Sequence, residues 1–467
     1  MRTEHVDLLI VGGGMAGSCA ALEAAQAGAQ VLLIEKQAET GGSSVLSGGC
    51  LAFAGTDLQA AHGVADGPEL LRKDLLEVGR HESDPALVQA YVDHQLDTYE
   101  WLKEQGVRFS PSLETSAGQS VPRVHTIDPA DAVRLLQARA LATGRVTLRT
   151  GVRAMRLLRA DEAAPVHGVL AEDRDGPLQI HSRDGVLLAS GGFCRDAGLV
   201  HRFAPQYANA VFVGGVRMDE YGEFIDGLRM AWKLGADLRD MAYIKGTFGK
   251  HPVDTTNHHS CQAVYKGAIA VNEEGRRFVD ESLSYKLLGD AVMAQPLHTA
   301  YQILDQRIFE SGDDRVRILD FGRRLEEGLL IKADSLQALA RMIEIPYEAL
   351  RATVDRYNGF VDAGVDADFG RRHLVHEHGA LVRIDTAPFY AYPSTAAVFG
   401  TYCGLRVDAD LRVIDVFGEP IAGLHAAGEV IGGFHGGAYM TGSALGKAAV
   451  FGRLAARAMT GAAAVAG

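Results

Sequence analysis

Residues 6–17 read Val6-Asp7-Leu8-Leu9-Ile10-Val11-Gly12-Gly13-Gly14-Met15-Ala16-Gly17, and this stretch decides the fold. The apolar run that precedes the glycines is short and ends abruptly, which predicts a buried strand. An alanine-rich helix is expected over 17–27, and a second apolar strand over 30–34. Strand, glycine loop, helix and strand make a βαβ unit, so we predict an α/β fold.

The glycines have the spacing Gly12-x-Gly14-x-x-Gly17. Glycines at these positions permit a tight turn and let a pyrophosphate approach the helix N-terminus, where N–H groups and the helix dipole attract it. Glu35 ends the second strand, where a carboxylate accepts hydrogen bonds from ribose hydroxyls. The complete set predicts a dinucleotide site of the Rossmann type. It does not separate FAD from NAD, although Glu35 argues against a 2′-phosphate.

Glycine is also the unusual entry in the composition. The 467 residues include 54 glycines and only 14 prolines, whereas about 33 glycines are expected at this length. The excess has no collagen-like period, so it should lie in turns and close backbone approaches. The length allows two to four domains.

Charge and cysteine usage exclude several classes of function. The net charge is −13, and an acidic chain repels phosphate backbones, so no nucleic-acid partner is expected. Five scattered cysteines without a C-x-x-C argue against disulfides, zinc and iron–sulfur clusters, which favours a cytoplasmic location. The N-terminus does not read as a signal peptide, and no apolar run is long enough for a transmembrane segment.

Further elements are indicated by periodicity along the chain. Residues 65–145 are expected to be mainly helical, and a hairpin turn is expected at 272–277. The remaining expectations are helices over 86–105, 129–142 and 220–234, strands over 145–159, 168–181 and 186–189, two helices within 334–363, and strand, glycine loop and helix in the final 60 residues.

A series of glycine clusters connects the whole chain to a known family. These clusters are Gly41-Gly42-Ser43-Ser44, Ser47-Gly48-Gly49, Ala189-Ser190-Gly191-Gly192-Phe193, Gly423-Leu424-His425-Ala426-Ala427-Gly428-Glu429 and Gly442-Ser443-Ala444-Leu445-Gly446-Lys447. Over nearly its full length the chain resembles the flavoprotein superfamily of fumarate reductase, succinate dehydrogenase and 3-ketosteroid dehydrogenases.

The resemblance implies a Rossmann-type FAD-binding domain (1–205 and 372–467) with an inserted α+β cap domain (206–371). It implies that Glu429 holds the ribityl or pyrophosphate region, and that Ser443, Ala444 and Leu445 face the flavin. The 41–44 loop lacks the histidine of covalent family members, so FAD should bind non-covalently. The residues expected at FAD are Gly12, Gly14, Met15, Ala16, Gly17, Glu35, Lys36, Gly42, Ser43, Ser44, Ser47, Gly48, Gly49, Val152, Ala189, Ser190, Gly191, Gly428, Glu429, Ser443, Ala444 and Leu445.

The positions that would hold a dicarboxylate depart from the fumarate reductase pattern. Such a substrate needs fixed positive partners, because unpaired buried charge is costly. At the positions of the proton-donating, clamping and second relay arginines this chain has Tyr285, Tyr439 and Tyr265. Cys261-Gln262 replaces the threonine–glutamate pair, and Gly400 or Phe399 replaces the clamp histidine. Fumarate and succinate are therefore not the expected substrates.

The replacements favour desaturation of a cyclic ketone. Glu281-Ser282-Leu283-Ser284-Tyr285 resembles the segment of the catalytic tyrosine of 3-ketosteroid dehydrogenases, and Tyr439-Met440-Thr441-Gly442-Ser443 resembles that of the 3-keto-5α-steroid 4-dehydrogenases. One tyrosine would remove the α-proton and the other would donate to the ketone oxygen, with the β-hydrogen leaving as hydride to flavin N5. We expect Tyr285 as base and Tyr439 as donor, roles that could be exchanged. Thr441 would be a relay, and a backbone N–H near Gly442 would assist.

Several alternatives stay open. The ketone could be a 3-ketosteroid or a smaller ring such as 4-oxocyclohexanecarboxylate, and the electron acceptor could be oxygen, a quinone or another flavoprotein. The second hypothesis is an enoate reductase of the fumarate or urocanate type. The third is a flavin-binding electron-transfer or structural subunit without its own substrate.

Histidines give a weaker signal. His373, His376 and His378 lie close in sequence, as do His251 and His258-His259. We expect no metal and interpret these histidines as a solvated face or an interface. Lys245, His251 or His258 could instead line the cap and meet a substrate carboxylate.

Overall fold

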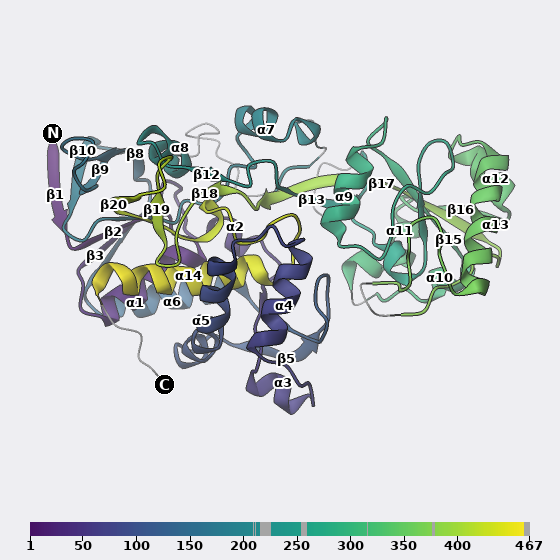
Figure 1. Ribbon diagram of the computed structural model, residues 1–467, viewed down its shortest axis with the longest axis horizontal. Coiled ribbons are helices and arrows are strands. Elements are labelled where there is room, and N and C mark those ends of the chain that lie inside the picture. The colour runs from purple at the N-terminus through teal and green to yellow at the C-terminus, as the bar shows by residue number, and fades with distance from the viewer. Residues whose placement is uncertain are drawn as a thin grey trace. The chain divides into compact units, whose positions relative to one another are not determined.

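The computed structural model describes residues 1–208, 210, 212–214, 226–253, 259–314, 316–375 and 379–461 (Figure 1). By contacts the chain divides into two compact units. The first comprises 1–204, 215–244 and 400–467, and the second comprises 205–214 and 245–399. Each unit is described by itself. The predicted role of residues 206–371 as a substrate cap stays a prediction.

The first unit is built on a sheet with strand order β19-β20-β11-β2-β3-β7. β2, β3, β7, β11 and β20 run parallel, and β19 pairs antiparallel with β20. Every residue of β2, β3 and β11 is buried, as expected for a parallel sheet covered on both faces. The bounds are β2 Leu8–Val11, β3 Val31–Ile34, β7 Val146–Arg149, β11 Val186–Leu188, β19 Arg412–Ile414 and β20 Pro420–Ala426.

Helix α1 (Met15–Gln26) connects β2 to β3, so the predicted βαβ unit is present. α1 packs against α14 (Ser443–Thr460) and α6 (Pro129–Ala142), and Figure 1 shows α1 beside α14. The two helices approach closely because Gly452 carries no side chain: a Cβ there would overlap the Ala16 carbonyl oxygen. This arrangement fits a Rossmann-type FAD-binding domain.

Two smaller sheets complete the first unit. One has the order β1-β10-β9-β8 and the other β4-β6-β5. The bounds are β1 Arg2–Val6, β8 Arg153–Leu158, β9 Gly168–Asp173, β10 Gly176–Ser182, β4 Cys50–Ala52, β5 Phe109–Glu114 and β6 Val124–Ile127. The strand expected over 145–159 is divided between β7 and β8, and the one over 168–181 is divided between β9 and β10.

The prediction of mainly helix over 65–145 was incomplete. Helices α4 (Pro68–Val78), α5 (Pro85–Glu104) and α6 are present, but β5 and β6 lie between them. These strands are held by pairing with each other and with β4, a tertiary contact that local periodicity does not report. The other elements of this unit are α2 Gly42–Val45, α3 Asp57–Ala61, α7 Ala197–Phe203, α8 Asp226–Lys233, β12 Leu238–Arg239 and β18 Gly404–Leu405. Residues 220–225 of the predicted helix 220–234 lie outside the described residues.

The second unit contains the sheet β13-β17-β15-β14, with β16 also pairing with β17. Its strands are β13 Ile244–Lys250, β14 Ile269–Val271, β15 Ala300–Asp305, β16 Ile331–Ala333 and β17 Phe389–Thr401. Its helices are α9 Tyr285–Met293, α10 Gln306–Glu310, α11 Phe321–Glu326, α12 Leu336–Met342 and α13 Tyr347–Ala363. α12 and α13 confirm the two helices predicted within 334–363. The hairpin turn predicted at 272–277 is confirmed by the backbone hydrogen bonds Asn272 N–H to Arg276 O and Gly275 N–H to Asn272 O.

Across the described ranges, no helix is both long enough and apolar enough to cross a membrane.

The glycine loop gives a first testable prediction. In Gly17→Ala the new Cβ would overlap the Gly12 carbonyl oxygen, and this clash should lower the free energy of unfolding by about 1–3 kcal/mol in urea titrations. Gly359→Ala is the matched control, because a Cβ there meets nothing within 4 Å and Gly359 lies inside α13. It should stabilise by about 0.5–1 kcal/mol. Equal effects of the two substitutions would contradict the steric role of Gly17.

Candidate active site

The glycine loop brings two backbone segments into contact. Gly12 has φ +114°, and a Cβ on it would overlap the carbonyl oxygen of Ala189. The Ala189 N–H donates to Val11 O at 2.8 Å, so the loop and the end of β11 are held together by backbone alone. Helix α1 begins directly after this contact, with Gly14 as N-cap. Its N-terminal N–H groups are therefore placed where a pyrophosphate would bind.

Glu35 accepts hydrogen bonds through both carboxylate oxygens. Gly13 N–H donates to one at 2.9 Å and Gln37 N–H donates to the other at 2.9 Å. The backbone of Glu35 is also fixed, because Val152 N–H donates to its carbonyl oxygen at 2.9 Å. The carboxylate is thus oriented beside the glycine loop, and its remaining lone pairs suit ribose hydroxyls.

The loop after β3 folds back onto the same helix start. Gly41 N–H donates to Gly13 O at 2.9 Å, and Met15 N–H donates to the Ser44 hydroxyl at 3.1 Å. Ser44 therefore occupies one of the N–H groups that α1 leaves unpaired. Gly49, with φ +71°, abuts the Ile127 carbonyl so closely that a Cβ would not fit.

Two buried hydroxyls in the first unit test whether the site suits FAD. The Ser190 and Thr401 hydroxyls are both buried, and within the part of the chain that the structure describes neither finds a hydrogen-bond partner. Buried polar groups are normally paired. The Glu429 carboxylate lies beside Thr401, accepting from Thr401 N–H at 2.9 Å. A cofactor rich in hydroxyl and phosphate oxygens would satisfy such groups, so these residues fit FAD.

Helix α14 starts at the position predicted to face the flavin. Gly442 is its N-cap with φ +91°, a conformation that favours glycine. The Ser443 hydroxyl donates to Met440 O at 2.7 Å. His435 Nδ1 lies 3.3 Å from Ser443 Oγ. Because the serine has one proton and uses it on the shorter bond, His435 Nδ1 is the donor to Ser443.

An aromatic cluster surrounds Tyr439. The Tyr402 ring stacks on it at a centroid distance of 5.4 Å and an interplanar angle of 10°, and the His435 ring lies 5.6 Å away. Gly442 N–H donates to the Tyr439 hydroxyl at 3.3 Å. Sequence reasoning did not select Tyr402 or His435. The position of His435 in Gly433-Phe434-His435-Gly436 was the available signal, whereas nothing local pointed to Tyr402.

Thr441, predicted as a relay, is held by the 116–119 loop. Its hydroxyl accepts from the Ser116 hydroxyl at 3.0 Å, its N–H donates to Ala117 O, and its carbonyl accepts from Gln119 Nε2 at 2.8 Å. These bonds fix the backbone between Tyr439 and Gly442. A relay role for its hydroxyl stays a prediction.

Lys447 is a buried cation one turn into α14. Its Nζ donates to Ile431 O at 3.4 Å and lies 5.9 Å from the centre of the Phe434 ring. Burial lowers the pKa of Lys447 to about 8, against the opposing influence of the Glu429 carboxylate. Burial thus disfavours the charged form of Lys447 inside the first unit.

Tyr285, the predicted base, lies in the second unit and is the first residue of α9. Ser284 caps this helix, accepting from Leu287 N–H at 3.4 Å. The side chain of Tyr285 is half-buried. The cofactor residues predicted from the sequence all belong to the first unit, together with Tyr439, Thr441 and Gly442.

The weaker histidine candidates are scattered. His251 packs edge-on against Tyr392, and the His373 carbonyl accepts from Arg371 Nε at 3.3 Å. His258, His376 and His378 lie outside the described residues. Among the residues that are described, no group of three or more His, Cys, Asp or Glu is arranged to hold a metal ion.

Comparison with known proteins agrees with the fold. Residues 7–445 match the FAD binding domain family. Over 460 residues the chain is 33% identical to a fumarate reductase (cytochrome) of Shewanella frigidimarina, spanning 97% of this chain and 76% of that protein. It is 29% identical over 456 residues to a vinyl phenol reductase of Lactiplantibacillus plantarum, spanning 91% and 90%. The crystal structure of 3-ketosteroid-Δ4-(5α)-dehydrogenase from Rhodococcus jostii RHA1 superposes with a TM-score of 0.82 at 24% identity over 98% of both chains, a likeness of fold alone.

The glycine loop, the oriented Glu35 and the buried hydroxyls, taken with these matches, define an FAD-dependent oxidoreductase that acts on carbon–carbon bonds. The chain belongs to the FAD binding domain family, within the fumarate reductase and succinate dehydrogenase flavoprotein superfamily.

Lys447 gives a pH-dependent prediction. Its pKa of about 8 in the folded chain lies below the ordinary 10.5, so unfolding takes up a proton between those pH values and stability rises with pH there. Relative to Lys447→Met, the wild-type chain should gain about 2 kcal/mol of unfolding free energy between pH 7 and pH 10. Urea titrations of both proteins measure this. If the difference in unfolding free energy between the two proteins stays constant with pH, the pKa of Lys447 is not lowered in the folded chain.

Proposed function

We propose that the chain desaturates a cyclic ketone next to its carbonyl, in one of the forms named above: a 3-ketosteroid or a smaller ring. A tyrosine takes the α-proton, and the β-hydrogen leaves with its electron pair. The electron pair that the α-proton leaves behind forms the new double bond between the α- and β-carbons. FAD, when bound, supplies the acceptor for that hydrogen and its two electrons. We propose that it binds non-covalently through the residues named in the sequence analysis.

The observation that carries the proposal is the hydrogen bond from Gly442 N–H to the Tyr439 hydroxyl. A hydroxyl that accepts one hydrogen bond becomes a stronger donor through its own proton, because neighbouring hydrogen bonds polarise each other. Tyr439 is therefore suited to donate to a ketone oxygen as negative charge develops there. Gly442, expected to assist at the ketone oxygen, would act instead through Tyr439.

Tyr285 is the proposed base. An ordinary tyrosine has a pKa of about 10, so to work near neutral pH its pKa must be lowered or it must pass its proton on. Its position at the first residue of α9, directly after the Ser284 cap, fixes its backbone and thus the direction of its Cα–Cβ bond. Tyr285 belongs to the second unit of the chain and Tyr439 to the first.

A second candidate is the reverse reaction, reduction of an activated double bond. It is favoured by the names of the sequence relatives, a fumarate reductase and a vinyl phenol reductase. The same residues serve either direction, since a tyrosine that removes an α-proton can also return it. The tyrosines favour a neutral ketone or enone over a dicarboxylate, which needs cationic partners.

Anaerobic mixing distinguishes the two directions. The purified yellow protein is mixed with a saturated 3-ketosteroid, 4-oxocyclohexanecarboxylate, succinate and a phenol with a saturated side chain, and flavin absorbance is followed. Bleaching by a ketone alone is the expected result. In the reciprocal experiment, the reduced protein is mixed with fumarate or a vinyl phenol. If these compounds reoxidise the flavin and no ketone bleaches it, the result favours the reductase and rejects the dehydrogenase for this panel.

Single substitutions test the residue roles. Tyr285→Phe should lower the bleaching rate constant by about 10²–10⁴-fold, the usual contribution of a general base. Tyr439→Phe should lower it by about 10²–10³-fold, as for loss of one oxyanion donor. Tyr390→Phe is the matched control, because it also removes one hydrogen bond of a tyrosine hydroxyl, the 2.6 Å bond to Gln306 Oε1. Full activity of Tyr285→Phe would remove its assignment as base.

A further inference from the structure

Tyr265 contacts the backbone of the segment that leads into the proposed base, Tyr285. It belongs to the single turn Ala263–Lys266, and its hydroxyl donates to Leu283 O at 3.2 Å. Burial raises the pKa of Tyr265, and the backbone of Tyr285 nearby opposes that rise. The hydroxyl thus holds the backbone one residue before Ser284, the cap of α9, and lies near the backbone of the residue after it.

The turn that carries Tyr265 is itself clamped by a buried arginine. Arg371 is fully buried, and its guanidinium donates to Val264 O at 2.7 Å and to Ala268 O at 3.0 Å. These carbonyls lie before and after Tyr265 in the chain. The same guanidinium reaches Glu281 at 3.3 Å, so the clamp connects the turn to the segment that leads into α9.

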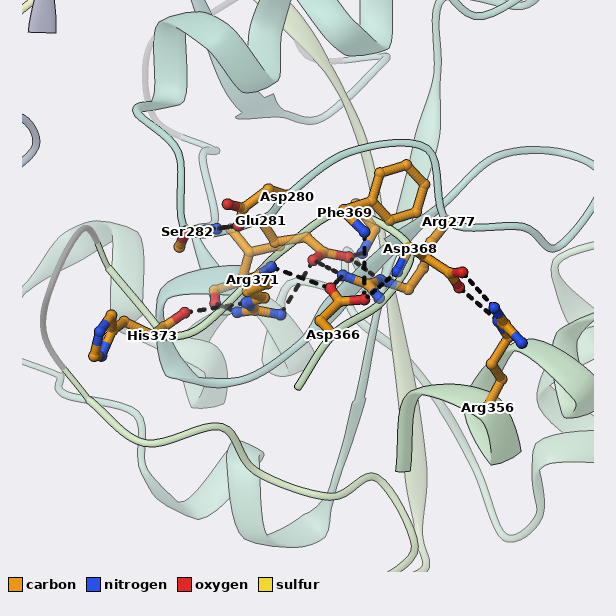
Figure 2. A network of polar contacts seen from close by, with 12 residues as sticks. Arg277, Asp280, Glu281, Ser282, Arg356, Asp366, Asp368, Phe369, Arg371 and His373 are labelled. Carbon is orange, nitrogen blue, oxygen red and sulfur yellow. Dashed lines mark hydrogen bonds and ion pairs between the residues drawn. The ribbon is translucent and has the colours of Figure 1, made fainter. Parts of the chain in front are cut away.

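Glu281 fixes the other end of that segment. It is fully buried and takes both nitrogens of the Arg277 fork, at 2.8 and 2.6 Å, while Ala270 N–H donates to it at 3.1 Å. Asp366 accepts from Arg277 at 2.8 Å and from Arg371 N–H at 3.3 Å. Figure 2 shows these four charged side chains converging. The two positive and two negative side chains neutralise each other, and we call these four residues the frame. Because they are largely buried, their hydrogen bonds have little freedom to rearrange.

We propose that Tyr265 is a positioning residue that sets the place of Tyr285 by holding the backbone at the start of α9, within the frame of Arg277, Glu281, Asp366 and Arg371. This inference rests on the proposed role of Tyr285.

The bonds of Tyr265 separate this role from proton relay. The hydroxyl donates its proton to the Leu283 carbonyl oxygen, and the backbone of Tyr285 lies near it. A relay needs a hydroxyl bonded to the group whose proton moves, whereas both of these neighbours are backbone. At the position where the resemblance implies a relay arginine, this chain therefore has a residue that holds the base instead of supplying it with protons.

A double-mutant cycle tests the connection. Tyr265→Phe keeps the ring and should lower the bleaching rate constant with an active ketone about tenfold, with the half-saturating concentration changed less than twofold. In a Tyr285→Phe background the same substitution should have an effect of less than about twofold, because a residue that acts through Tyr285 has nothing left to act on. Tyr390→Phe is the control and should be near neutral in both backgrounds. An equal loss in both backgrounds would overturn the proposal.

Hydrogen exchange tests the same contact without catalysis. Amides of peptides covering 283–288 should exchange about tenfold faster in Tyr265→Phe than in wild type or Tyr390→Phe, while the rest of the chain is unchanged. Unchanged exchange there would overturn the positioning role even if the rate falls. Faster exchange, together with a Tyr285→Phe variant of full activity, would instead reject Tyr285 as base and leave the contact itself established.

Discussion

Contact between backbone atoms at the glycine loop is the constraint on which the first unit depends. Gly12 lies against the carbonyl of Ala189, and Gly17 lies against the carbonyl of Gly12. These contacts place the start of α1 directly over the ends of β2 and β11. The carboxylate of Glu35 and the hydroxyl of Ser44 lie at that point, bonded to Gly13 N–H and Met15 N–H. A single added methyl group would separate the strands from the helix start.

Much of this arrangement is readable from the sequence because it is local. The spacing of Gly12, Gly14 and Gly17 and the apolar runs beside them predict the βαβ unit, and α12 and α13 follow from periodicity around Pro346. The stacking of Tyr402 on Tyr439 is not local. It depends on how the chain after β17 returns to the first unit, and no pattern near residue 402 encodes it. Strands β5 and β6 were missed for the same reason.

The residues around the two proposed catalytic tyrosines differ in how they are stabilised. Around Tyr439 the contacts described above are with the rings of Tyr402 and His435 and with a backbone N–H. In the segment that leads to Tyr285 the contacts are ionic and largely buried, with Arg277 and Glu281 in a bidentate pair. Several charged hydrogen bonds give that segment rigidity.

The contact between α1 and α14 has a consequence for biosynthesis. Gly452 meets Ala16, and β20 pairs with β11, so the first unit joins residues separated by most of the chain. Contacts of such long sequence separation form slowly. The early βαβ segment therefore emerges from the ribosome with one face of α1 uncovered, and that face stays uncovered until α14 has been made. Completion of this nucleotide-binding core waits for α14, and the nascent chain is most exposed to chaperones and proteases during that interval.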